Sequence, residues 1–202
     1  MTVLAAGPWR NNAELILDVR ELGYLSDDQA ILDPTWGLGR FWTLWYPRGL
    51  VATDLDPEKS PTGEPVDFTD LPWPEETFDA VVLDPPYKLN GTGGSHPSDA
   101  GYGVATSGVA WQARHALIRL GMSESVRVLK PSGVLLLKCQ DQVCSGAVRW
   151  QTDEFTAHAE TLGLRKIDRF DLATYRPQPA GRRQVHARRN TSTLLVFRKA
   201  RR

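Results

Sequence analysis

The chain of 202 residues contains only two cysteines, Cys139 and Cys144, and four histidines. Two cysteines are too few for a disulfide scaffold, and the histidines lack the paired spacing of metal ligands, which argues against a zinc site. No apolar run approaches the length of a membrane span, and the first residues lack the basic region of a signal peptide. We therefore expect a protein of the reducing cytoplasm, with no metal and no membrane partner.

The chain also lacks an excess of charge of either sign, because 24 Arg and Lys side chains balance 24 Asp and Glu. Its hydrophobic share of 41% is ordinary for a globular protein, and its length suits one domain over residues 1–202. The charge is unevenly spread, since residues 165–202 hold twelve basic side chains and two acids. Such a segment is typical of a surface that binds a phosphate backbone; a solvated tail is the alternative.

Short apolar strands alternate with segments of helical period, a pattern that predicts an α/β fold with a mostly parallel sheet covered on both faces. We expect strands at 30–33, 50–54, 78–83, 134–139, 165–172 and 192–198, a short third strand ending near Asp67, and helices at 12–22, 110–129 and 154–162. A further helix should follow the turn at Gly37–Gly39 and run through Leu44.

Two segments break this alternation. Residues 88–108 contain six glycines and no apolar period, and residues 173–191 are rich in proline and arginine. Loops of this length in compact domains are usually functional or disordered. We interpret both as insertions that contact a substrate.

The segment Asp84-Pro85-Pro86-Tyr87 follows the apolar strand residues 80–83. Each proline lacks an N–H, so the chain must leave the sheet here, at the carboxyl end of a strand, where open α/β sheets bind their ligands. Asp84 and a proline carbonyl can accept hydrogen bonds from an amino-bearing ring on which Tyr87 stacks. A plain rigid turn is the alternative.

Three further acids follow earlier strands. Asp33 opens the turn Asp33-Pro34-Thr35-Trp36-Gly37-Leu38-Gly39; Asp54, followed by Leu55, lies about 20 residues on, where a carboxylate can bind ribose hydroxyls; and Asp67 precedes Phe68, as an adenine contact would. Asp56 and Asp70 compete with them as capping residues. A nicotinamide site is the rival interpretation, but Trp42 replaces the third glycine of its motif. The acids favour a cationic or neutral adenosine ligand.

These motifs resemble those of the S-adenosylmethionine-dependent DNA amino-methyltransferases. The turn Asp33–Gly39 is similar to the family's methionine-binding motif, Asp54 to its ribose-binding acid, Asp67-Phe68 to its adenine contact, and Asp84–Tyr87 to its catalytic motif. The passage Val128–Lys138 is similar to its helix-to-strand passage, whereas Trp36 replaces a commoner small residue. The resemblance implies a single-domain, Rossmann-like class I methyltransferase with a mostly parallel seven-stranded sheet and an antiparallel C-terminal hairpin.

The resemblance also implies a function. S-adenosylmethionine would be the cofactor, bound by Asp33, Pro34, Thr35, Gly37, Gly39, Asp54, Leu55, Asp67, Phe68 and Asp84, and the catalytic residues would be Asp84, Pro85, Pro86 and Tyr87. The substrate would be DNA, and the expected target is the N6 amino group of an adenine that is flipped out of the helix. Lys88, Arg182, Arg183, Arg188, Arg189 and Asn190 are the candidate nucleic-acid contacts.

Several alternatives remain open at this point. They are an RNA methyltransferase acting on guanine N2 or adenine N6, a DNA N4-cytosine methyltransferase, and an inactive cofactor-binding subunit of a methyltransferase complex. A homodimer or a partner subunit is compatible with the sequence. The chain has no room for a large separate target-recognition domain, which argues against stringent selection of a DNA sequence.

Overall fold

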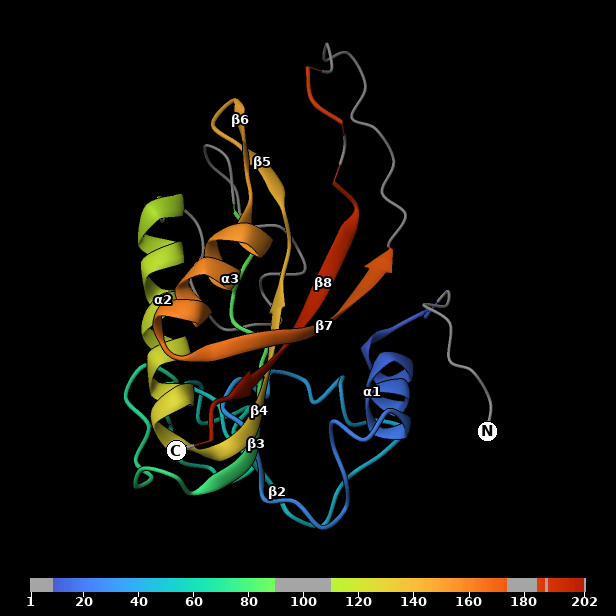
Figure 1. Cartoon of the computed structure of the whole chain (residues 1–202), viewed down its shortest axis with the longest axis vertical. Helices are drawn as coiled ribbons and strands as arrows, with labels where there is room; N and C mark the ends of the chain where they lie inside the picture. The colour runs from blue at the N-terminus through green and yellow to red at the C-terminus, as the bar shows by residue number, and fades with distance from the viewer. Residues whose placement is uncertain (1–8, 90–109, 174–184, 188, 202) are drawn as a thin grey trace.

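The computed structural model describes residues 9–89, 110–173, 185–187 and 189–201. Its main sheet, in that part of the chain, has six strands in the order β2-β1-β3-β4-β8-β7 (Figure 1). The strands are β1 (Ile31–Asp33), β2 (Leu50–Ala52), β3 (Phe78–Leu83), β4 (Leu129–Cys139), β7 (Leu164–Ala173) and β8 (Thr191–Lys199). The first four are parallel, whereas β8 is antiparallel to β4 and to β7. The mixed α/β fold and the antiparallel C-terminal hairpin are confirmed.

The prediction of a short third strand ending near Asp67, which would have made a sheet of seven strands, was wrong. Within the described residues the chain after β2 makes only one isolated bridge, between Asp54 and Pro65, in place of a strand. Prolines 57, 61 and 65 remove N–H donors from this segment. Gly63 also turns the backbone to a φ of 74°. The segment therefore cannot form a continuous ladder with β2.

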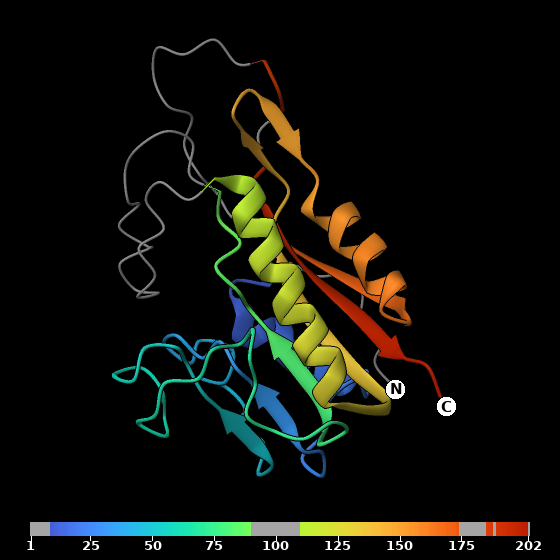
Figure 2. The same cartoon turned by 90° about the vertical axis from the view of Figure 1, so that its left-hand side faces the viewer.

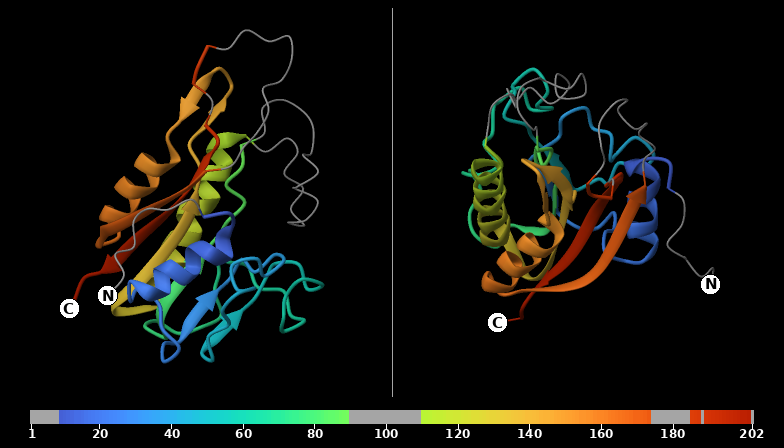
Figure 3. Two further views of the ribbon diagram at one scale, coloured as in Figure 1. Left: turned by 90° about the vertical axis from the view of Figure 1, so that its right-hand side faces the viewer. Right: turned by 90° about the horizontal axis from the view of Figure 1, so that it is seen from above.

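In the described part of the chain, three helices cover the sheet: α1 (Asn12–Glu21), α2 (Trp111–Val128) and α3 (Gln151–Thr161). α2 and α3 lie on one face (Figure 2), and α1 lies on the other (Figure 3). The side chain of Asn11 caps α1 by accepting the N–H of Glu14 at 2.9 Å. In the described ranges, none of these helices has both the length and the apolar character needed to cross a bilayer.

The helix expected after Gly39 is absent, and residues 34–49 form successive turns instead. Two buried tryptophans stabilise these turns. The indole N–H of Trp42 donates to Asp33 at 2.7 Å, and that of Trp45 donates to Asp27 at 3.0 Å. Burial of these two rings takes the place of a regular helix on the α1 face of the sheet.

Alternation along the central strands divides the core between two faces. Val81, Leu83, Leu135, Leu137, Leu195 and Phe197 pack with α2 and α3, and Ala80, Val82, Val134, Leu136, Leu194 and Val196 pack with α1 and the turn residues. All twelve are buried. Such burial on both faces explains why these strands read as continuous apolar runs.

A small hairpin that the sequence did not predict follows β4. Its strands are β5 (Gln142–Cys144) and β6 (Ala147–Arg149), joined by Ser145 and Gly146 with φ values of 52° and 74°. Two consecutive positive φ values are typical of a tight hairpin turn. Strand β4 also begins at Leu129 rather than 134, with a register shift against β3. Most of the expected substrate loops, at 90–108 and 174–184, lies outside the described residues.

Candidate functional site

A cavity lies at the carboxyl edge of the parallel strands. It is lined by Pro34, Thr35, Asp54, Leu55, Phe68, Asp84 and Pro86, which come from the segments after β1, β2 and β3. All seven residues were candidates from the sequence, and the structure brings them together around one space. The cavity has a volume of about 40 Å³ and is open to one side, so a ligand of nucleoside size would extend out through its mouth.

Asp33 lies beneath this cavity rather than in its wall. The carboxylate is buried and accepts hydrogen bonds from the indole of Trp42 at 2.7 Å and from the backbone N–H of Thr35 at 3.0 Å. Burial disfavours the charged form and raises the pKa of Asp33 to about 6, against the lowering effect of these donors. Asp33 therefore shapes the turn after β1 from within.

The turn itself depends on glycine. Gly37 and Gly39 have φ values of 57° and 62°, a region that other residues rarely adopt. A Cβ at Gly39 would also overlap the ring of Trp36. The N–H of Gly37 donates to Asp54 Oδ2 at 2.7 Å, so the turn after β1 is tied to the end of β2.

Asp54 is the acid that both lines the cavity and holds its wall. Its Oδ2 accepts from Gly37, and its Oδ1 accepts from the N–H of Asp56 at 2.9 Å. A carboxylate has about four lone-pair sites, so each oxygen keeps the capacity to accept a ligand hydroxyl. Asp56 itself pairs with Lys59 at 2.9 Å and is not a cavity residue.

Asp67 and Phe68 separate in the structure. Asp67 is exposed, and its Oδ1 accepts from the N–H and hydroxyl of Thr69 at 2.8 and 2.7 Å, a local turn of its own. Phe68 is buried, lines the cavity and packs against Gly121 of α2. Of this pair, only Phe68 reaches the cavity.

The segment Asp84–Tyr87 is fixed by bonds to three other parts of the chain. The N–H of Asp84 donates to the Thr35 hydroxyl at 2.8 Å, and the N–H of Tyr87 donates to the Pro85 carbonyl at 2.6 Å. The Tyr87 carbonyl accepts from the side-chain amides of Gln142 at 2.9 Å and Gln151 at 2.8 Å. These contacts hold the backbone of the segment at the cavity.

Asp84 is an acid of unusual affinity for its proton. Burial raises its pKa to about 7; the ammonium of Lys138 opposes this rise, and the nearby Asp33 adds to it. Asp33 ends β1 and Asp84 directly follows the adjacent strand β3, so like charges meet at this edge. The site can thus accept hydrogen bonds and favours a ligand with positive charge.

Sequence reasoning missed four residues of this neighbourhood: Trp42, Lys138, Gln142 and Gln151. One signal was available, because Lys138 interrupts the apolar run 134–139 with a charge. Gln142 and Gln151 could not be found from spacing, since their partner Tyr87 lies 55 and 64 residues away.

The basic residues of the C-terminal third that the structure describes lie in two separate places. Arg189 lies at the carboxyl edge of the parallel strands, where its carbonyl accepts from Gln140 at 3.0 Å and its guanidinium lies 4.5 Å from the centre of the Trp150 ring. Lys88 and Asn190 are partly buried, and Arg182, Arg183 and Arg188 lie outside the described residues. The expected footprint is therefore divided.

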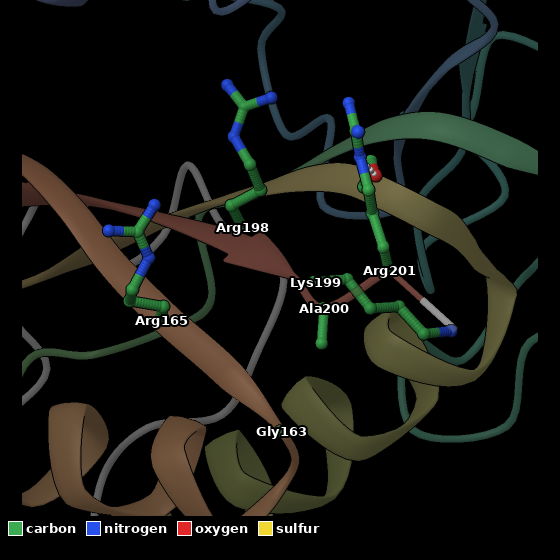
Figure 4. Close-up of a pocket in the computed structure, with 7 residues that line it drawn as sticks. Gly163, Arg165, Arg198, Lys199, Ala200 and Arg201 are labelled. Atoms are coloured by element: carbon green, nitrogen blue, oxygen red, sulfur yellow. Dashed lines mark hydrogen bonds between the residues drawn. The ribbon is translucent and has the colours of Figure 1, made fainter.

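Other basic residues of the C-terminal third line a second cavity, of about 370 Å³, at the opposite edge of the sheet. This cavity is formed by Ser132, Gly163, Arg165, Arg198, Lys199, Ala200 and Arg201. Arg198 pairs with Val134 near the start of the β4 ladder, whereas Asp84 follows the carboxyl end of β3. Figure 4 shows Arg165, Arg198 and Arg201 extending to the same side of the sheet. This cavity is larger, but it contains no acid and no candidate catalytic residue.

No family model matches the sequence, and no curated protein matches it. The fold is similar to that of a protein from Bacillus halodurans assigned as a methyltransferase, with a TM-score of 0.58, 15% identity and coverage of 92% of this chain and 98% of that one. It is also similar to an S-adenosylmethionine-dependent methyltransferase from Methanosarcina mazei, with a TM-score of 0.55, 13% identity and coverage of 91% and 98%.

The [4+2]-cyclase SpnF is a third similar structure, with a TM-score of 0.56, 14% identity and coverage of 99% of this chain and 89% of that one. The architecture is thus that of class I methyltransferases. At these identities the likeness concerns the fold alone, and a cyclase among the similar structures means that the reaction must be argued from the site.

Proposed function

We propose that this chain is an S-adenosylmethionine-dependent methyltransferase that methylates an exocyclic amino group of a DNA base, adenine N6. The observation that carries the proposal is the shared cavity of Asp54, Phe68, Thr35, Asp84 and Pro86. Residues for a nucleoside and residues for an amino group thereby meet at one sheet edge, the usual ligand position in open α/β folds.

The residues present fit this cofactor. Asp54 retains acceptor sites for ribose hydroxyls, Phe68 offers an apolar wall for an adenine ring, and the paired acids Asp33 and Asp84 favour a cation. When bound, S-adenosylmethionine would supply a methyl group attached to a positively charged sulfur. The bond from the amino nitrogen to the methyl carbon forms as the sulfur–carbon bond breaks, and the sulfur is left as a neutral thioether. The turn Pro34–Gly39 would border its methionine end.

Asp84 has the central role in the proposed chemistry. An amino group conjugated to a ring is a poor nucleophile because its lone pair is delocalised. Hydrogen bonds from its protons to the Asp84 carboxylate and the Pro85 carbonyl would favour a tetrahedral nitrogen, whose lone pair then points at the methyl group. After methylation the nitrogen is acidic, and Asp84 or water takes its proton. The Pro85 carbonyl already accepts from Tyr87 but retains a second lone pair.

A nucleic-acid substrate is supported by charge at the same edge. Lys88 directly follows Tyr87 and acts on Asp84, and the Arg189 carbonyl accepts from Gln140, which follows β4 at the same edge. Gln142, which donates to the Tyr87 carbonyl, also accepts the N–H of Leu89 at 3.0 Å. A base inside a duplex cannot reach Asp84 and would be flipped out, with Tyr87 stacking on the ring. The aspartate that opens Asp84–Tyr87 favours adenine over cytosine in the family this sequence resembles.

Transfer of tritiated methyl groups from labelled cofactor tests this proposal. Duplex DNA, single-stranded DNA and RNA would be offered to the wild-type chain and to Asp84→Asn, and the products hydrolysed to nucleosides. We expect label in N6-methyladenine of DNA with the wild type alone. Label confined to RNA would contradict the DNA assignment, and no transfer to any nucleic acid would contradict the proposed function.

A further inference from the structure

Lys138 is a buried lysine, and its direct contacts do not include a negative charge that would offset the free energy of burying its ammonium. Its side chain is 1% exposed, and its Nζ donates to the neutral Asn12 Oδ1 at 2.9 Å and lies 5.9 Å from the Phe41 ring centre. No carboxylate of the described chain lies within ion-pair distance of it. Burying an ammonium without a close counter-charge costs several kcal/mol, on the order found for buried ions.

The position of Lys138 in the sheet relates it to Asp84. Leu83 of β3 and Leu137 of β4 are register partners, and Asp84 and Lys138 are the next residues of these adjacent parallel strands. Two residues earlier, Val82 and Leu136 both face the α1 side, where Asn12 and Phe41 also lie. Lys138 and Asp84 are therefore neighbours at the carboxyl edge, with Asp33 at the end of the next strand, β1.

The groups around this pair are mostly acidic. Asp33 and Lys88 act on Asp84, Asp54 acts on Asp33, and Cys139 and Asp171 act on Lys138. Asp171 is itself paired with Arg169 at 3.0 Å, and α1 contributes only the neutral amide of Asn12. Lys138 is therefore the buried cation that balances one of two carboxyls, the buried Asp33 and the half-buried Asp84.

We propose that Lys138 is a positioning residue that keeps the Asp84 carboxylate ionised, and thus able to accept hydrogen bonds from an incoming amino group. This inference rests on the proposed function for its meaning, but the coupling of the two side chains can be measured without it. An ionised Asp84 offers acceptors from both oxygens, whereas a protonated one would present a donor to the amino group.

The direction of the charge effects agrees with this role. Burial already raises the pKa of Asp84 to about 7, so removal of the opposing ammonium would leave the acid mostly protonated at neutral pH. Burial likewise lowers the pKa of Lys138, and Asp84 is the largest influence that raises it again. Each group thus stabilises the charged form of the other.

The direct test follows the carboxyl carbon of Asp84 by ¹³C NMR during a pH titration of the ligand-free protein. Lys138→Gln keeps a donor for Asn12 but removes the charge, and Lys138→Arg keeps the charge. We expect Lys138→Gln to raise the pKa of Asp84 by about one to two units, because a nearby buried charge is lost. Lys138→Arg keeps that charge and should leave the pKa of Asp84 close to the wild-type value. A rise below half a unit in Lys138→Gln would overturn the inference.

A second variant leaves the lysine in place. Asn12→Asp sets a carboxylate against the Lys138 ammonium and offsets its field at Asp84, so it should also raise the pKa of Asp84; no rise would overturn the inference. This variant decides the question if Lys138→Gln does not fold by circular dichroism.

Kinetics separate this inference from the proposed function. In the methyl-transfer assay, Lys138→Gln should move the acidic limb of the pH–rate profile upward by the shift measured by NMR, with about a tenfold loss at pH 7 that recovers at higher pH. A purely structural role would lower the rate equally at every pH. If the pKa of Asp84 rises in Lys138→Gln but the wild type transfers no methyl group, the coupling is supported and the proposed function is contradicted. If the wild type transfers methyl groups but the pKa of Asp84 is unchanged in Lys138→Gln, only the inference is overturned.

Discussion

Thr35 and Asp84 are joined by a hydrogen bond, in which the Asp84 N–H donates to the Thr35 hydroxyl oxygen at 2.8 Å. The same hydroxyl lies 3.3 Å from Asp33 Oδ1, so it can donate there in turn. One side chain thus connects the turn after β1 to the segment after β3, 49 residues away. The candidate cofactor residues and the candidate catalytic residues are held in one frame by this threonine.

Thr35→Val should therefore affect both halves of the site. Valine keeps the shape but leaves the Asp84 N–H without its acceptor, at a cost of about 1–3 kcal/mol. We expect a lower melting temperature and weaker cofactor binding by calorimetry. Thr35→Ser retains the oxygen and is the matched control, with most of both properties retained. Equal behaviour of the valine and serine variants would show that the hydroxyl has no such role.

Gln142 and Gln151 converge on one acceptor, the Tyr87 carbonyl, at 2.9 and 2.8 Å. The double variant Gln142→Leu with Gln151→Leu should loosen Tyr87 and reduce the rate of methyl transfer about tenfold or more, since orientation supplies much of the acceleration. Cofactor affinity should change little, because neither glutamine lines the cavity. A double-mutant cycle on kcat would show whether the two donors act together. Unchanged kcat in the double variant would contradict this account.

Gly121 of α2 is close to the ring of Phe68, and a Cβ at this position would overlap that ring. Gly121→Ala would normally favour a helix by up to about 1 kcal/mol. Here it should instead displace Phe68 and weaken cofactor binding several-fold. Leu120→Ala, at an exposed position of the same helix, is the control. Tighter or equal binding in Gly121→Ala would show that Phe68 does not form the wall of a nucleoside site.

Asp33 should make stability depend on pH. Its pKa is raised by burial to about 6 in the folded chain, against about 3.9 in the unfolded chain, so the native state binds the proton more tightly. The resulting stability is fully present below pH 4 and is lost as pH rises through 6, up to about 3 kcal/mol for this group. Denaturant unfolding of wild type and Asp33→Asn at pH 4 and pH 7.5 measures this. We expect a smaller decline in the variant; parallel declines would refute it.

The strand ends that form the site were predictable because each is marked by a local sequence pattern. Apolar runs that end in a carboxylate or a proline mark where a parallel strand leaves the sheet, and such ends share one edge. Asp54 and Asp84 could therefore be placed in one cavity from the sequence. Phe68 followed from its place next to Asp67, although only the ring reaches the cavity.

What the sequence could not predict depends on long-range partners. Asp67 was a candidate from spacing, but it is exposed, and its Oδ1 accepts both the N–H and the hydroxyl of Thr69 in a turn of its own. Residues 39–44 carry a plausible helix period, yet burial of Trp42 against Asp33 favours turns. The role of Lys138 depends on Asp84 and Asn12, which approach it only through the register of β3 with β4 and the packing of α1.

The central claim is that one crevice at the sheet edge binds the cofactor and presents Asp84 to an amino group. Calorimetric titration with S-adenosylmethionine, paired with methyl transfer to DNA, tests it most directly in wild type and Asp84→Asn. The account predicts cofactor binding by both proteins and transfer by the wild type alone, with a loss of at least a thousandfold in the variant, which combines lost orientation and lost charge. Undiminished transfer by Asp84→Asn, or no cofactor binding by the wild type, would contradict it.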